Sequence, residues 1–131
     1  MGFLRLVFLL WAFSTASFAM AAMSTIDFVQ VLNGNSTEAD YYYRENWQAL
    51  RKKAQKRGYI QSWQLLNVTY TEQTPYHYML ITTYADAQQF EQRESNFQKL
   101  IEEQGTIKLL NHIKPTDFRK TVNTTNAISL R

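Results

Sequence analysis

Hydrophobic residues recur along this chain with two different spacings, and the order of those spacings limits the folds that it can adopt. Two segments, 36–57 and 87–104, carry apolar residues three and four positions apart, as one face of a helix does. Segments rich in β-branched and aromatic residues precede, separate and follow them. We therefore predict the order strand, helix, strand, strand, helix, strand between residues 25 and 115.

Both predicted helices carry start and stop signals. Each begins with a side chain that can cap the helix and, three residues later, one that can return the hydrogen bond, in the manner of a capping box. These pairs are Asn35 with Glu38 and Asp86 with Gln89. A glycine, Gly58 or Gly105, follows each helical pattern and is a natural stop.

The predicted strands, 26–32, a hairpin over 63–84 and 107–113, are apolar on both faces. Ile26 and Phe28 point to one side of the first strand, while Val29 points to the other. A sheet with helices on one face and water on the other would alternate apolar and polar residues. With only two helices in the chain, we expect a second copy to cover the open face, giving a homodimer through sheet faces.

Residues 1–21 have the composition of a signal peptide. Arg5 precedes an apolar run, 6–13, and Ala19-Met20-Ala21 has the small-x-small spacing that signal peptidase accepts. The run is shorter than the about 20 residues that a membrane-spanning helix needs, although an uncleaved anchor is an alternative. We expect a periplasmic or secreted protein of roughly 110 residues, with no stable membrane anchor after cleavage.

Composition excludes several kinds of site. The chain has no cysteine, which rules out disulfides, thiolate zinc sites and a cysteine nucleophile. Its 14 basic and 11 acidic side chains nearly balance, so nucleic acid is not an expected partner. No phosphate-binding glycine loop or paired metal-ligand spacing occurs, and we expect neither cofactor nor metal. We predict one domain over 22–118 and a flexible tail over 119–131, where apolar residues are few.

The pattern resembles the dimeric α+β barrel superfamily (ABM/NIPSNAP-like, with a ferredoxin-like fold), and within it a set of exported bacterial members of unassigned function. The residues that carry the resemblance are Asn46-Trp47, Gly58-Tyr59-Ile60, Ser62-Trp63, Leu65, Tyr76-His77-Tyr78 and Tyr84. The resemblance implies a four-stranded antiparallel sheet in the order 4-1-3-2, with two helices on one face and a pocket between helices and sheet. The wider group includes cofactor-independent monooxygenases, haem-degrading enzymes, isomerases, chlorite-dismutase-like proteins and apparent non-enzymes.

The chain has two histidines, His77 and His112. In the implied strand order they would lie on the order of 19 Å apart, too far to share one metal ion. Either alone could act as a general base or haem ligand, and an ordinary half-buried strand histidine is the alternative that we favour. The second helix lacks the histidine that ligates iron in the haem-degrading relatives.

Aromatic residues are concentrated where the implied pocket would lie. In the monooxygenase relatives a tryptophan and an asparagine bind and activate the substrate, and Trp63 with Asn67 is the nearest counterpart here. The candidate ligand-binding residues are Trp63, Tyr78, Trp47, Tyr43 and Phe90. The alternative is that these side chains simply form the core.

Glu94 is the polar member of an otherwise apolar series on the second helix, on the face expected to look at the sheet. A carboxylate there must be hydrogen-bonded, reach solvent along the flank of the helix, or lie in a pocket. It joins His77 and Asn67 as a candidate catalytic residue.

Three functional hypotheses remain open on the sequence. We favour a dimeric binding protein for a small apolar or aromatic molecule. A cofactor-independent monooxygenase- or isomerase-like enzyme is the alternative from another class, and a purely structural or interaction protein is the third. The sequence leaves open whether the protein is an enzyme.

Overall fold

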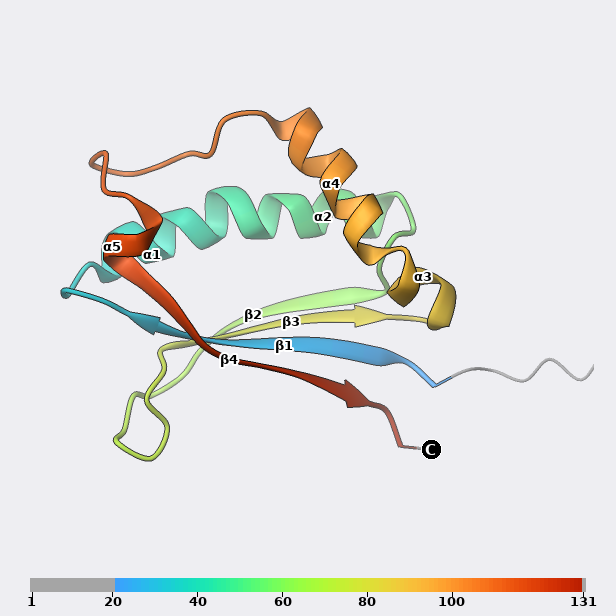
Figure 1. The fold of residues 1–131 in the computed structure, drawn as a ribbon, viewed down its shortest axis with the longest axis horizontal. Coiled ribbons are helices and arrows are strands. Elements are labelled where there is room, and N and C mark those ends of the chain that lie inside the picture. Colours follow the sequence, from blue (N-terminus) through green and yellow to red (C-terminus); the bar gives the residue numbers. More distant parts are fainter. Residues whose placement is uncertain (1–20, 131) are drawn as a thin grey trace, which may run out of the picture.

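The computed structural model describes residues 21–130, in which a sheet lies under a layer of helices (Figure 1). The strands are β1 (Met23–Val31), β2 (Ser62–Asn67), β3 (Tyr78–Tyr84) and β4 (Arg119–Ile128). The helices are α1 (Ser36–Tyr42), the π-helical segment η1 (Tyr43–Gln48), α2 (Ala49–Lys56), α3 (Ala87–Glu91), α4 (Arg93–Gln104) and α5 (Pro115–Phe118). The strands follow the order β2-β3-β1-β4, and all neighbours are antiparallel. The predicted α+β class, with helices on one face of a four-stranded antiparallel sheet, is confirmed.

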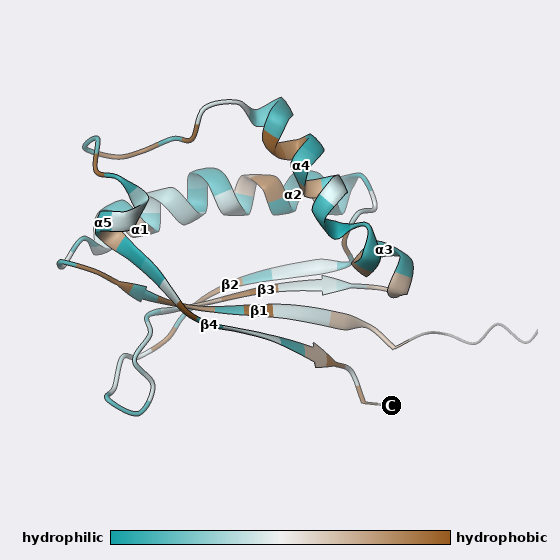
Figure 2. Cartoon of the chain, viewed as in Figure 1, coloured by the Kyte–Doolittle hydropathy of each residue, from teal (hydrophilic) through white to brown (hydrophobic). Residues whose placement is uncertain are grey.

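The fourth strand is β4, and the prediction of a strand over 107–113 is wrong. That segment links α4 to α5. Two of its hydrophobic residues (Figure 2), Leu109 and Ile113, pack against the core cluster that contains Phe118 instead of forming a strand. β4 pairs with β1 through its backbone, although its side chains are nearly all exposed. The predicted flexible tail, 119–131, is therefore a strand over most of its length, because ladder hydrogen bonds do not depend on apolar side chains.

The helix signals are confirmed at three of four places. Asp86 caps α3 by accepting a hydrogen bond of 2.8 Å from the Gln89 backbone N–H. Gly58 and Gly105 follow α2 and α4 with φ of 71° and 75°, a conformation that favours glycine. Asn35 precedes α1 without a side-chain cap, and its Nδ2 donates to the Asp117 carbonyl, 3.2 Å away. That bond ties the start of α1 to α5.

The space between helices and sheet is filled by side chains. The first cluster contains Val29, Ala39, Tyr43, Tyr78, Leu80 and Phe118, and the second contains Ala54, Ile60, Tyr84 and Leu100. Arg51 enters this layer from α2, with its guanidinium carbon 4.5 Å from the Trp47 ring centre and 4.1 Å from that of Phe97. Its Nε donates to Oγ1 of Thr82 at 3.1 Å, and burial lowers the pKa of Arg51 to about 10.

The second predicted helix is two helices. The chain leaves helical geometry at Gln92, where α3 ends and α4 begins. The apolar series that the sequence placed on one face is therefore interrupted between Phe90 and Glu94. Glu94 lies exposed in the first turn of α4, and the expectation that it faces the sheet is wrong.

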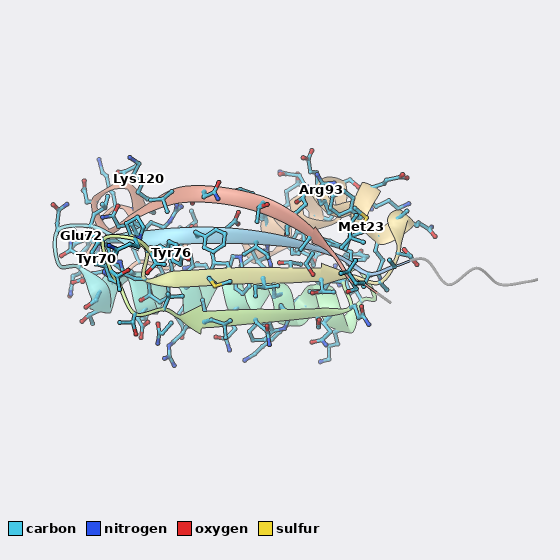
Figure 3. All side chains as sticks on the ribbon, turned by 90° about the horizontal axis from the view of Figure 1, so that it is seen from below. Met23, Tyr70, Glu72, Tyr76, Arg93 and Lys120 are labelled. Atoms are coloured by element: carbon cyan, nitrogen blue, oxygen red, sulfur yellow. The ribbon has the colours of Figure 1, made fainter. Side chains whose placement is uncertain are left out.

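The other face of the sheet is apolar at its centre, as the sequence predicted. Ile26 lies opposite Ile81, and Phe28 lies opposite Met79 on the neighbouring strand. The ring of Tyr76 packs against Phe28 with 4.7 Å between centroids. Figure 3 views this face directly, and none of the helices drawn in it crosses in front of the sheet.

The predicted signal peptide lies outside the described residues, apart from Ala21. Between residues 21 and 130, no helix has the length and hydrophobicity needed to cross a bilayer.

Candidate functional site

The largest group of candidate residues meets at the end of the sheet where α1 faces the β2–β3 hairpin. A cavity of about 520 Å³ lies there, which we call the α1–β3 cleft. Its polar lining includes Asp40, Arg44, Asn67, His77 and Tyr78, and its apolar lining includes Val31, Val68 and Leu110. Three residues that the sequence nominated separately, Asn67, His77 and Tyr78, are therefore brought together.

His77 is held in one orientation. Its Nδ1 accepts a hydrogen bond of 2.9 Å from the Val31 backbone N–H, and its ring stacks on Tyr70 with 4.9 Å between centroids. Because Nδ1 accepts this bond, the neutral ring carries its proton on Nε2. Within residues 21–130, Nε2 makes no hydrogen bond and is the nitrogen left to meet a ligand.

Tyr78, Asp40 and Arg44 form a connected polar group at the rim of the cleft. The Tyr78 hydroxyl donates to Oδ1 of Asp40 at 2.8 Å, and Oδ2 of Asp40 lies 3.5 Å from a guanidinium nitrogen of Arg44. Burial, and then the bond to Asp40, raise the pKa of Tyr78 well above its usual value. Tyr78 therefore stays protonated and acts as a donor, while Asp40 and Arg44 remain partly open to solvent.

A second cavity of about 300 Å³ adjoins the first and shares Asp40, Arg44, Asn67 and Tyr78 with it. Trp63 lines this part, so it lies beside Asn67 as the sequence analysis considered. Its indole also packs edge-on against Trp47, 6.0 Å away between centroids. One face of Trp63 thus belongs to the core and another part borders the cleft.

The remaining candidates lie elsewhere. Tyr43 is 3% exposed, packs against Tyr78 and is a core residue. Phe90 is half-buried and packs edge-on against Tyr84 of the second core cluster. Trp47 lines a different cavity, between α2 and the end of α4. Glu94 is exposed, and His112 is exposed in a turn with φ of 55°.

Sequence reasoning missed Asp40 and Arg44. The signal that could have found them is their spacing, because an acidic and a basic residue four positions apart lie next to each other on one helix face. Nothing in the sequence indicates that this pair lies beside Tyr78, since that contact depends on how α1 crosses β3.

Comparison with known proteins supports the architecture. No family model and no curated protein matches the sequence. A solved structure of an uncharacterised NIPSNAP-like domain protein from Burkholderia xenovorans aligns at 8% identity with a TM-score of 0.50, over 86% of each chain. The fold of this chain is similar to the fold of that NIPSNAP-like domain protein. HapK from Hahella chejuensis aligns at 13% identity with a TM-score of 0.50, over 82% of this chain and 92% of that one.

The four-stranded antiparallel sheet, its strand order and the helices on one of its faces, which the sequence resemblance implied, are thus confirmed. At these identities the likeness concerns the fold alone, and function has to be argued from the residues of this chain.

Proposed function

We propose that this protein binds a small molecule in the α1–β3 cleft. The observation that carries the proposal is the convergence of polar side chains on one cavity of about 520 Å³, among them Asp40 from α1, Arg44 from η1, Asn67 from β2, and His77 and Tyr78 at the start of β3. Ligand sites usually measure roughly 300–1,000 Å³ and combine a mostly apolar wall with a few convergent polar groups.

The lining indicates the chemistry of the ligand. Arg44 and Nε2–H of His77 can donate hydrogen bonds, and the carboxylate of Asp40 can accept one. Val31, Val68 and Leu110 add apolar surface to the same cleft. An apolar or aromatic body with one polar end, such as a carboxylate or an amide, fits this arrangement.

The α1–β3 cleft lies at the edge of the helix–sheet layer, so the ligand binds beside this layer rather than inside it. The interior is occupied by packed side chains, among them Tyr43, Leu80 and Phe118. A ligand in the cleft needs no rearrangement of that core.

Native mass spectrometry of the protein purified from its own host tests the proposal. We expect a retained compound, and we expect the double variant Arg44→Gln/Asn67→Leu to lose it while keeping a wild-type circular dichroism spectrum. Lys53→Gln on the exposed side of α2 is the matched control and should retain the compound. Retention by the double variant, or no retained compound together with no thermal shift from a panel of small aromatic acids and amides, would contradict the proposal.

A proton-transfer enzyme of the isomerase or monooxygenase type is the second candidate. It is favoured by the presence of a neutral histidine and a carboxylate, His77 and Asp40, in one cleft. Conversion of the retained compound on incubation, lost in His77→Gln but unchanged in Lys53→Gln, would select this candidate over plain binding.

We also propose that the open sheet face pairs with a second copy of the chain. Besides Ile26, Phe28, Met79 and Ile81, the side chains on this face are mostly uncharged, and Lys120 stands near its edge on β4 (Figure 3). A charge-free apolar centre is typical of interfaces and can face its own copy without repulsion.

Finally, we propose that residues 1–21 are removed on export to the periplasm or the medium. Cleavage after Ala21 would leave β1 whole, because the strand begins at Met23 and Ala22 still accepts a hydrogen bond from Ser129. Intact-mass measurement of the exported protein should give a chain that begins at Ala22; a mass that includes residues 1–21 would contradict this proposal.

A further inference from the structure

A separate cavity of about 170 Å³ lies between the consecutive segments α1, η1 and α2 on one side and the end of α4 on the other. Tyr42, Trp47 and Leu50 form one side, and Ile101, Gln104 and Ile107 form the other. It shares no lining residue with the α1–β3 cleft. A cavity of about 150 Å³ lined by apolar side chains is large enough to bind benzene, so this one can hold a single six-membered ring.

One polar atom of a residue that lines this cavity has no partner among residues 21–130. Oε1 of Gln104 is buried and, among residues 21–130, accepts no hydrogen bond. A buried carbonyl oxygen without a donor is unfavourable, and native proteins normally supply one. Tyr42, Asn46 and Trp47 line the cavity with hydrogen-bond donors, but none of them bonds to this oxygen among residues 21–130, so the position is open to a donor on a bound molecule.

The cavity opens between exposed hydrophobic side chains, and hydrogen bonds hold one of its walls in place. Ile101 and Ile107 are 48% and 53% exposed, unusually open for large aliphatic residues. The segment that carries Ile107 is held by Asn46, whose side chain bonds to both backbone groups of Lys108. Asn46 belongs to the π-helical turn η1, and such turns are frequent at functional sites.

We propose that this cavity is a second binding site, which takes a phenol-sized ring bearing one hydroxyl group. The ring lies against Trp47 and Leu50, and its O–H donates to Oε1 of Gln104 after that side-chain amide turns toward the ring, because the oxygen is buried as it stands. The site is independent of the function proposed for the cleft.

Two-dimensional NMR of the full protein tests this with phenol and benzene as probes. We expect phenol to shift the indole N–H of Trp47 and the side-chain amide of Gln104, and to bind roughly five- to tenfold more tightly than benzene, as one hydrogen bond to a buried acceptor allows. Gln104→Met should remove this preference while still binding benzene. Gln98→Met, the same change on the exposed side of α4, should leave it intact.

A second variant keeps the test decisive if Gln104→Met alters the helix end. Leu50→Phe fills the cavity and should abolish the Trp47 shifts with both probes. Equal affinity of phenol and benzene for the wild type, or phenol shifts that persist in Leu50→Phe, would overturn the proposal. Phenol shifts centred on Trp63 and His77 instead would also overturn it, because they would place the probe in the α1–β3 cleft.

Discussion

The side chain of Asn46 pairs with both backbone groups of Lys108, accepting from its N–H at 2.9 Å and donating to its carbonyl at 2.8 Å. The same amide nitrogen also donates to the Tyr42 carbonyl at 3.0 Å. A single side chain thus joins the π-helical turn to the segment that follows α4, 62 residues further along the chain.

Asn46→Leu should destabilise the protein by about 2–4 kcal/mol, since each buried polar group left unpaired costs roughly 1–3 kcal/mol. Urea denaturation followed by circular dichroism measures this. Gln48→Leu, in the same turn and without a hydrogen bond among the described residues, is the control and should stay within about 0.5 kcal/mol of wild type. An equal loss of stability in both variants would show that the hydrogen bonds of Asn46 to Lys108 do not account for the destabilisation.

Arg51 is a partly buried cation held by two aromatic rings and Thr82, with no carboxylate in ion-pair distance among residues 21–130. Arg51→Met keeps the apolar stem and removes the buried charge, so we expect stability within about 1 kcal/mol of wild type, or higher. Arg51→Ala also removes the stem and should cost about 2–3 kcal/mol. Denaturation midpoints of the two variants check this, and a Met variant as unstable as the Ala variant would contradict it.

Tyr43 should make the protein less stable in alkali. Burial raises its pKa above the usual value of about 10, so the folded state keeps a proton that the unfolded state releases. The stability that this provides is complete below about pH 10 and declines as the pH rises further, by up to about 1.4 kcal/mol per pH unit.

Tyr43→Phe should therefore show a shallower decline than wild type in urea denaturation between about pH 8 and about pH 11. Tyr78 and Tyr84, whose pKa values burial also raises, keep part of the decline in the variant. Parallel curves for variant and wild type would show that Tyr43 ionises as easily in the folded state as in the unfolded one.

Ile81→Glu should convert the proposed dimer to a monomer, because it places a carboxylate at the centre of the open sheet face. Light scattering after size-exclusion chromatography measures the mass. Gln55→Glu adds the same group to the exposed side of α2 and should leave the dimer intact. A wild-type protein that is monomeric at every concentration would contradict the dimer.

The sequence predicted correctly those features of the fold that depend on neighbouring residues, namely three helix ends and the burial pattern of β3. Asp86, Gly58 and Gly105 mark helix ends through their own hydrogen bonds and dihedral angles, and the two-faced pattern of β3 reflects burial under the helices. β4 could not be found in this way, since its residues from Lys120 to Ile128 are exposed and it is held by backbone pairing.

The sequence predicted only those residues of the candidate site that lie close together along the chain. Asn67, His77 and Tyr78 belong to one hairpin, so their proximity follows from the chain itself. Asp40 and Arg44 join them only through the crossing of α1 over β3, which no local pattern encodes. Glu94 was misplaced because a periodic series was continued across Gln92, where the helix breaks.

The position of β1 has a consequence for how the chain folds. This strand is the first in the sequence, yet both of its neighbours, β3 and β4, are made later, and β4 ends at Ile128. Long-range pairings of this kind form slowly. The nascent chain therefore has no complete sheet until Ile128 has been synthesised, and the unfolded state that this prolongs is the one that the proposed export through a narrow channel would require.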